Sequence, residues 1–353
     1  MKILVISLAG IGDTLIATPL LHELRANFPA ATIDVLVMWP GAKDLLEHNP
    51  HINRVFQKNL MKCGRLEALR FLWSLRREGY QLSINTHPQS RIHYRVAAWL
   101  AGAPVRISHE YECFTWLDRW LVTSTLPQDY TRHAAENNLA VLPLIGAQEK
   151  LPAHELEIFL TPAEDKWADD FLTRAGLTDK KWLGVHVGSG GTKNLALRRW
   201  PLENFIELSQ GLLTWQKDFP ILFFGGPEEA VGHEKIRSQL SNAIFPPTKN
   251  LRQVAALLRQ ARAFLSVDTA LMHVAAAMKV PAQLVIETPT WNRPIEPFGN
   301  SFTLIENPVV AGRGLDFYRY DGGDIKGTRE ELLVCMESVK VANVFNKVKQ
   351  VIN

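Results

Sequence analysis

Short apolar runs alternate with helix-like patterns along the first half of the chain. Strands that are buried in a parallel sheet read as nearly continuous apolar runs. The runs predict strands at Lys2–Ser7, Thr32–Val37, Arg54–Phe56, Gln81–Asn85 and Val105–Ser108, and the patterns between them predict helices at about Thr14–Phe28, Arg65–Glu78, Ser90–Ala101 and Arg132–Ile145. This alternation predicts a parallel sheet with helices on both faces.

The second half repeats the alternation after a stretch without periodicity. Residues 146–160 lose the pattern and contain Pro152, which favours a linker. A helix start follows, with Thr161 as the N-cap, Pro162 at the first helical position and Glu164 completing a capping box. Strands are predicted at Trp182–Val187, Pro220–Phe224, Ala263–Val267 and Ala282–Ile286, and helices at about Leu202–Leu213, Glu228–Leu240, Leu251–Gln260, Thr269–Met278 and Thr328–Val351.

These patterns predict an α/β protein with two Rossmann-like, doubly wound domains. We place the first domain at residues 1–150 and the second at 151–325, and we expect a C-terminal helix at 326–353 to pack back toward the first domain. A chain of 353 residues is also long for a single core. Open α/β sheets bind ligands beyond the carboxyl ends of their strands, so we expect the two domains to face a central cleft.

Composition narrows the functional classes. The net charge of +3 is small for this length and argues against a nucleic-acid partner. Cys63, Cys113 and Cys335 lie far apart, which suggests neither a disulfide framework nor a zinc site and favours a cytoplasmic location. No apolar stretch approaches the roughly 18–20 residues of a membrane span, so any membrane contact is expected to be peripheral.

The first predicted strand leads into a loop that contains Gly10, Gly12 and Asp13. The two glycines suit a tight turn, but Leu15 occupies the position of the third glycine in a dinucleotide-binding fingerprint. An NAD- or S-adenosylmethionine-dependent enzyme is therefore disfavoured. Asp13 at a helix start can cap the helix or act as a base, and the loop alone leaves both interpretations open.

Three later loops could bind an anion or a nucleotide. Residues 188–193 combine three glycines with two hydroxyls and a lysine, a pattern that suits an anion cradle or a plain surface loop. Asp268 stands where a strand becomes a helix, so the helix amides that follow could meet a diphosphate, or Asp268 could be a simple N-cap. Acids after the strand at Pro220–Phe224 could hold ribose hydroxyls or merely begin a helix.

Together these segments resemble the family-nine glycosyltransferases, the ADP-heptose:lipopolysaccharide heptosyltransferases, over nearly the whole chain. The segment Gly10-Ile11-Gly12-Asp13-Thr14-Leu15-Ile16-Ala17-Thr18-Pro19 looks like the family's Gly-hydrophobic-Gly-Asp signature ending in Thr/Ser-Pro. Asp268-Thr269-Ala270-Leu271-Met272-His273 is similar to its Asp-Ser/Thr-Gly-X-X-His. Gly188-Ser189-Gly190-Gly191, followed by Arg198-Arg199-Trp200-Pro201, looks like its phosphate loop and Lys-X-Trp-Pro.

The resemblance implies a GT-B fold and an inverting transfer of heptose from ADP-heptose to a lipopolysaccharide core sugar. Asp13 would be the base, with Gly10 and Gly12 shaping its loop. The donor-binding residues implied are Ser189, Gly190, Thr192, Lys193, Arg198, Glu228, Asp268, Thr269, Ala270 and His273, with Glu229 as the alternative to Glu228 near the nucleoside. No cofactor is expected besides the ADP-sugar substrate. No Asp-X-Asp motif is evident and the positive loop can replace a metal ion, so we expect metal-independent transfer.

Three departures from the family pattern keep alternatives open. Arg198 stands in place of a lysine, Ala270 in place of a glycine, and Glu287 in a segment that usually contains Phe-Gly-Pro-Thr. The chain could therefore use another nucleotide sugar. It could also be a non-catalytic nucleotide-sugar-binding homologue, although retention of Asp13 argues against that.

The acceptor is expected to be a lipid-linked saccharide at the cytoplasmic face of the inner membrane. The predicted helix at Arg65–Glu78 mixes cations with Trp73 and Phe71, which suits contact with anionic lipid or with phosphorylated sugars. The favoured interpretation is an amphipathic helix that packs its apolar side on the sheet. Arg95, in the helix after the fourth strand, could meet acceptor anions or be an ordinary helix-surface residue.

Overall fold

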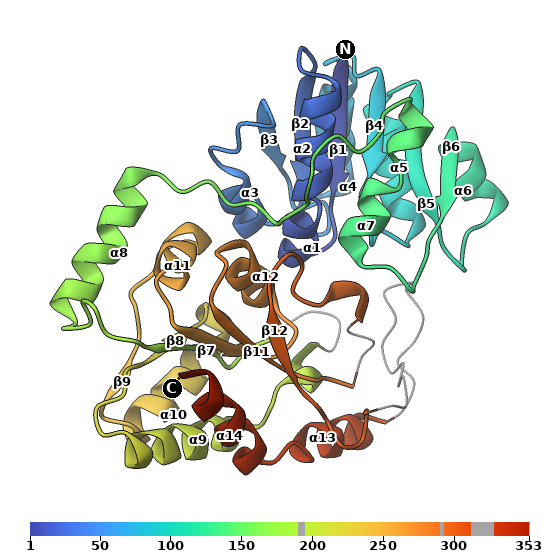
Figure 1. Cartoon of the computed structure of the whole chain (residues 1–353). Helices are drawn as coiled ribbons and strands as arrows, with labels where there is room; N and C mark the ends of the chain where they lie inside the picture. Colours follow the sequence, from blue (N-terminus) through green and yellow to red (C-terminus); the bar gives the residue numbers. More distant parts are fainter. Residues whose placement is uncertain (190–194, 290–292, 312–327, 353) are drawn as a thin grey trace. The chain divides into compact units, whose positions relative to one another are not determined.

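The computed structural model describes residues 1–189, 195–289, 293–311 and 328–352 (Figure 1). The chain divides into two compact units, each with its own sheet. The first unit comprises Met1–Phe159 and the short segment Arg293–Phe298, and the second comprises the remaining described residues from Leu160 onward. No helix of the described residues is long and apolar enough to cross a membrane.

The first unit is built on a parallel sheet of six strands in the order β3-β2-β1-β4-β5-β6. Its strands are β1 (Lys2–Ser7), β2 (Thr32–Val37), β3 (Arg54–Gln57), β4 (Leu82–Asn85), β5 (Val105–Glu110) and β6 (Ser124–Pro127). β1 is central, and Val5 is in register with Val35 of β2 and with Ile84 of β4. Burial on both faces explains why β1 reads as an unbroken apolar run.

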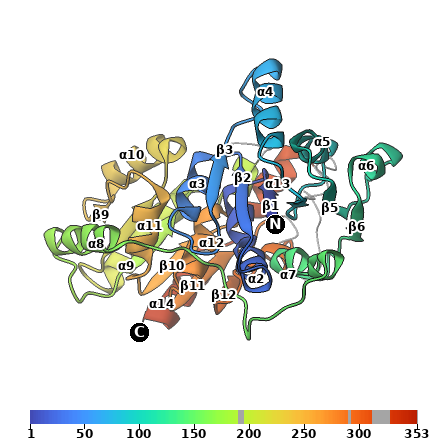
Figure 2. The same ribbon diagram turned by 90° about the horizontal axis from the view of Figure 1, so that it is seen from above.

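Helices cover both faces of this sheet (Figures 1 and 2). They are α1 (Ile11–Ile16), α2 (Thr18–Asn27), α3 (Pro40–Leu46), α4 (Arg65–Arg76), α5 (Ile92–Ala101), α6 (Trp116–Leu121) and α7 (Ala134–Leu139), with a 3-10 turn η1 at Leu142–Ile145. Ile3 and Val5 pack with α2, whereas Leu4 and Ile6 pack with α4 and α5 on the opposite face. Successive side chains of a strand point to opposite faces, so one strand serves both layers.

The second unit repeats the plan, with strand order β12-β11-β10-β7-β8-β9. Its strands are β7 (Leu183–His186), β8 (Ile221–Phe224), β9 (Ala243–Ile244), β10 (Ala263–Ser266), β11 (Ala282–Ile286) and β12 (Phe302–Ile305). Its helices are α8 (Pro162–Arg174), α9 (Leu202–Trp215), α10 (Ala230–Gln239), α11 (Leu251–Leu258), α12 (Ala270–Ala277), α13 (Arg329–Glu337) and α14 (Val341–Ile352), with 3-10 turns η2 (Leu195–Arg198) and η3 (Pro227–Glu229). The turn η4 (Arg293–Ile295) belongs to the first unit.

Two predicted helices are each divided in the structure. The helix predicted at Thr14–Phe28 is α1 followed by α2, which starts at Thr18-Pro19, where proline without an N–H suits a helix start. The single helix expected at 326–353 is two helices, α13 and α14, in the described residues. Met336, Val344 and Val348 lie in the core of the second unit, because their apolar side chains complete its packing.

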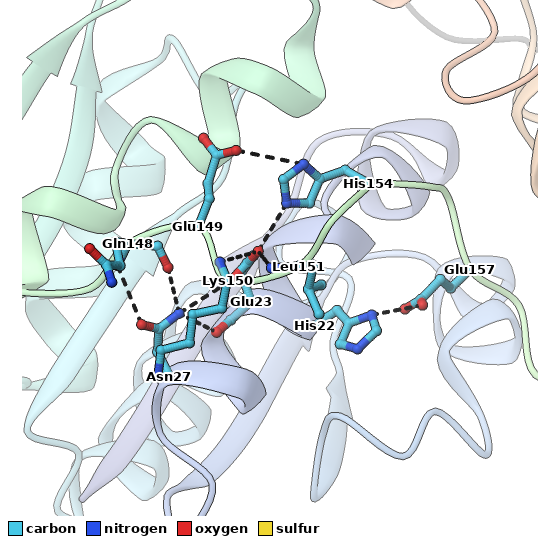
Figure 3. A network of polar contacts seen from close by, with 9 residues as sticks. All are labelled: His22, Glu23, Asn27, Gln148, Glu149, Lys150, Leu151, His154 and Glu157. Atoms are coloured by element: carbon cyan, nitrogen blue, oxygen red, sulfur yellow. Dashed lines mark hydrogen bonds and ion pairs between the residues drawn. The ribbon is translucent and has the colours of Figure 1, made fainter.

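The segment that leaves the first unit is fastened to α2 by a buried carboxylate (Figure 3). Glu23 accepts hydrogen bonds from the backbone N–H groups of Lys150, at 2.9 Å, and Leu151, at 2.8 Å, and contacts Nε2 of His154 at 3.0 Å. Burial alone would raise the pKa of Glu23, but these hydrogen bonds outweigh it and lower the pKa. Residues 146–160, the predicted linker, contain no helix or strand. Their backbone is nevertheless held in place, because the N–H groups of Lys150 and Leu151 donate to Glu23.

Candidate active site

In the first unit, the loop after β1 holds Asp13 at the third residue of α1. The N–H of Gly10, the N-cap residue, donates to Oδ2 of Asp13 at 2.6 Å. A Cβ at Gly10 would lie 2.8 Å from that oxygen, which explains the glycine. Asp13 and Gly12 are only partly buried. Capping thus fixes the carboxylate at the carboxyl end of β1 and still leaves it partly exposed, so capping and a role as base are compatible.

Buried polar side chains follow the ends of β4 and β5, the next strands beyond β1 in the sheet. Nδ1 of His87 lies 3.2 Å from the hydroxyl of Tyr111, which accepts the N–H of Gln89 at 2.8 Å. Burial raises the pKa of Tyr111, and the negative charge of Asp13 adds to that rise. Tyr111 is therefore within electrostatic reach of Asp13. Sequence patterns gave no signal for Tyr111, because it is a lone tyrosine beyond a strand end.

Arg95 is a buried residue, not a helix-surface residue. Its side chain is buried in α5, and Nε lies 2.6 Å from Oδ1 of Asp118. Its other nitrogens donate to the backbone carbonyls of Gln89 and Ser90. The guanidinium therefore holds the chain after β4 in place.

In the second unit, the loop after β10 brings Asp268 against Arg198. The two side chains form a buried ion pair. The N-cap of α12 is Thr269, whose Oγ1 accepts the N–H of Met272 at 3.4 Å, so the cap lies one residue beyond Asp268. Nδ1 of His186, at the end of β7, lies 3.2 Å from the same Oγ1. Ala270 begins α12 and is partly buried, and His273 is buried one turn further on.

The loop after β7 is described only in part. Gly188 and Ser189 are described and Ser189 is buried, whereas the predicted donor residues Gly190, Thr192 and Lys193 lie outside the described residues. A Cβ at Gly188 would lie 2.2 Å from Oε1 of Glu229, so the carboxylate of Glu229 lies directly against this loop.

Of Glu228 and Glu229, the two acids expected to approach the nucleoside, Glu229 is the one that adjoins this loop. Oε1 of Glu229 lies 3.4 Å from Nη2 of Arg199, and Oε2 accepts the N–H of Gly226 at 2.8 Å. Glu228 is exposed on η3. The sequence could not distinguish Glu228 from Glu229, because both are glutamates and only the folded chain shows that Glu229 points back to Gly188.

The structure therefore gathers Arg198, Asp268, Thr269 and His186 around the ends of the adjacent strands β7 and β10. Glu229 and Arg199 lie beside them, at the end of β8 and of η2. Chemically, this group offers a cation and the N-terminus of α12, both suited to a phosphate.

Trp200 and Glu287 have structural partners. The indole Nε1–H of Trp200 donates to the carbonyl of Val339 at 2.9 Å, and its ring is fully buried. Oε2 of Glu287 accepts the N–H of Asn307 at 2.9 Å. Glu287 thus fastens the end of β11 to the segment after β12.

The described residues contain one group of potential metal ligands, made of His22, His51 and Glu157 in the first unit. Nδ1 of His22 lies 2.9 Å from Oε1 of Glu157, and the two imidazole rings are stacked at 3.7 Å. This group fastens the segment after Lys150 to α2 and lies apart in sequence from the donor loops.

Acidification should destabilise the second unit through His186. Burial, with the charges of His233 and Arg199, lowers the pKa of His186 to about 3. Between its ordinary pKa near 6.5 and about 3, the unfolded chain binds a proton that the folded unit does not, so stability is present above pH ~6.5 and lost as the pH falls. One such group contributes a slope of up to about 1.4 kcal/mol per pH unit. We expect His186→Gln to reduce the slope of unfolding free energy between pH 7 and 4, measured in urea; an unchanged slope would contradict this assignment.

Comparison with known proteins is consistent across sequence and structure. The family model described as glycosyltransferase family 9 (heptosyltransferase) matches residues 68–309. The chain is 27% identical over 290 residues to lipopolysaccharide heptosyltransferase 3 of Escherichia coli K12, covering 76% of this chain and 78% of that protein. It is 24% identical over 335 residues to lipooligosaccharide heptosyltransferase 2 of Haemophilus ducreyi, covering 89% and 91%.

Solved structures show the same fold. A family 9 glycosyl transferase from Veillonella parvula superposes with a TM-score of 0.77 at 20% identity, covering 99% of this chain and 97% of that one. The E. coli heptosyltransferase WaaC with ADP gives a TM-score of 0.70 at 18% identity, covering 99% and 100%. With two parallel six-stranded sheets, the fold class is GT-B, as expected from the sequence.

Proposed function

The chain belongs to glycosyltransferase family 9, and from this premise we propose that it transfers a heptose from ADP-heptose to a sugar of the lipopolysaccharide core. The acceptor in this proposal is a lipid-linked saccharide at the cytoplasmic face of the inner membrane. The observation that carries the proposal is the carboxylate of Asp13, held by the N–H of Gly10 at the end of β1 and partly exposed. The family premise and the heptosyltransferase relatives support the choice of sugar.

The proposed reaction inverts the anomeric carbon of the donor. An acceptor hydroxyl attacks that carbon opposite the diphosphate, a carbon–oxygen bond forms, and the bond from the carbon to the diphosphate oxygen breaks. The hydroxyl proton goes to Asp13, a step of the kind that contributes about 10²–10⁴-fold to rate.

Negative charge develops on the departing ADP, and the second unit supplies the groups to stabilise it. The N-terminus of α12 carries a partial positive charge, and Arg198 contributes a guanidinium held in place by Asp268. Lys193 and the glycines beside it would complete the phosphate contacts. Asp13 belongs to the first unit and the donor residues to the second, so the proposed reaction requires both units.

Nucleotide preference gives a first test. We expect ADP to bind more tightly than UDP, GDP or NAD by calorimetry, because the proposed donor is an ADP-sugar. Binding of NAD alone would contradict the transferase proposal, and preference for UDP or GDP would favour another nucleotide sugar.

A second test concerns the metal. Transfer from ADP-heptose should continue in EDTA, because cationic side chains take the role of a metal. Activity that is lost in EDTA and restored by Mg²⁺ would contradict metal independence.

A further inference from the structure

We propose that the exposed surface of α4, α5 and α6 docks on an anionic phospholipid bilayer. This surface carries nine large apolar side chains that are exposed to solvent, and we call it the tryptophan face. Its members are Met61, Leu66, Leu69, Trp73, Ile92, Trp99, Trp116, Leu117 and Trp120. All lie in the first unit, on or beside three helices of which α5 packs against both α4 and α6 (Figure 2).

The exposure of these side chains is larger than ordinary surface composition explains. Trp116 is 79% exposed, Leu66 71%, Trp120 60% and Trp73 53%. Soluble monomers rarely gather large apolar side chains on one surface without a binding role. The tryptophan face contains most of the exposed large apolar side chains found among the described residues.

As the sequence favoured, α4 packs one apolar side on the sheet. Only Leu72 and Leu75 of that helix are buried against the sheet, whereas Leu66, Leu69 and Trp73 remain exposed. The helix therefore has a second apolar side that the first unit does not cover. The ring of Trp99 lies 5.4 Å from that of Trp120, which joins α5 and α6 into the same surface.

Charge identifies the occupant as an anionic surface. Between residues 61 and 120 the exposed acids are Glu67 and Glu112, and Glu67 is paired with Lys58. The exposed cations in the same range are Lys62, Arg65, Arg70, Arg76, Arg77, Arg91 and Arg119, of which Arg119 is paired with Glu110. Tryptophan prefers the boundary between lipid and water, and cations near an anionic bilayer each gain about 1 kcal/mol.

Docking would place the first unit at the surface that carries the acceptor, and this consequence rests on the proposed function. The docking itself does not depend on the sugar or on catalysis. Its test can therefore fail or succeed independently of the transfer assay.

Vesicle binding tests the proposal. The full chain should bind vesicles of phosphatidylglycerol and phosphatidylcholine at low salt, and bind weakly to vesicles of phosphatidylcholine alone. The double variant Trp116→Ser/Trp120→Ser should bind at least about tenfold more weakly, because two apolar side chains lose their burial in the bilayer. Arg65→Glu/Arg70→Glu should bind about 30-fold more weakly or worse, given the attraction of each cation to the surface. Val231→Ser, at an equally exposed apolar residue of the second unit, is the matched control and should bind like the original chain.

The same experiment tests whether the variants fold and whether a second copy of the chain, rather than lipid, covers the tryptophan face. The variants should keep the urea-unfolding free energy of the original chain, which shows that the first unit folds, and should keep transfer to a soluble acceptor. No binding to phosphatidylglycerol vesicles at low salt would overturn the proposal, as would equal binding by the original chain and the tryptophan variant. Self-association of the original chain that Trp116→Ser/Trp120→Ser abolishes, without vesicle binding, would assign the face to a second copy of the chain and overturn the lipid assignment.

Discussion

Asp13→Asn should slow glycosyl transfer by about 10²–10⁴-fold and leave ADP affinity unchanged. Asparagine keeps an oxygen that can accept the N–H of Gly10, so the cap of α1 and the loop should survive. The change removes only the capacity to take the acceptor proton. Single-turnover transfer and calorimetry with ADP measure the two effects separately.

Glu136 offers a matched control in the same unit. It is the third residue of α7 and accepts the N–H of His133 at 3.1 Å, as Asp13 accepts the N–H of Gly10. Glu136→Gln removes the charge of an equivalent capping acid and should leave the transfer rate unchanged. Equal loss of rate in Asp13→Asn and Glu136→Gln would mean that capping, rather than proton transfer, accounts for Asp13.

Arg198→Met should lower the unfolding free energy of the second unit by about 3–5 kcal/mol and weaken ADP binding. The substitution removes the guanidinium from a buried ion pair and leaves the carboxylate of Asp268 without that partner in a site of low polarity. It also removes a cation from the proposed diphosphate contacts. Urea unfolding and calorimetry with ADP report the two losses.

The pair Arg259–Asp165 shows what an exposed ion pair contributes in the same unit. Both side chains are at least a third exposed, so water screens the attraction. Arg259→Met should therefore cost less than about 1 kcal/mol and leave ADP affinity intact. A comparably small cost for Arg198→Met would contradict the importance assigned to the buried pair.

Local signals in the sequence predicted much of the fold. Thr161 and Glu164 form the expected capping box at the start of α8, with the N–H of Thr161 donating to Oε2 of Glu164 at 2.7 Å. The apolar runs of β1 and β2 match the predicted strands because both faces of those strands are buried. Such signals depend only on neighbouring residues or on a burial pattern that repeats.

Elements without a repeating buried face were missed. Within the described part of the chain, the edge strand β6 pairs only with β5, and it has no fully buried residue, so its sequence lacks an apolar run. In α6, Trp116, Leu117, Trp120 and Leu121 recur at helical spacing, but the helix has only six residues, too few for a pattern that is judged over a window of about 11–18 residues.

Site residues were predictable only where a motif marks them. Asp13 and Asp268 were predicted because each stands in a segment that resembles a family motif. Tyr111 was not predicted, because its relevance comes from His87, which is distant in the sequence. Glu228 and Glu229 were left as alternatives, because only the contacts of Glu229 with Arg199 and Gly188 separate the two. The N-cap of α12 was placed one residue early, since Asp268 and Thr269 both suit a cap and only the ion pair with Arg198 separates their roles.

The central claim is heptose transfer from ADP-heptose with Asp13 as the base, and product analysis tests it most directly. Heptose-deficient lipopolysaccharide is incubated with ADP-heptose and the chain, and the product is examined by mass spectrometry and for its anomeric configuration. The account predicts one added heptosyl residue, inverted at the anomeric carbon, with the original chain, and almost none with Asp13→Asn. Transfer of a different sugar, retention of configuration, or full activity of Asp13→Asn would contradict it.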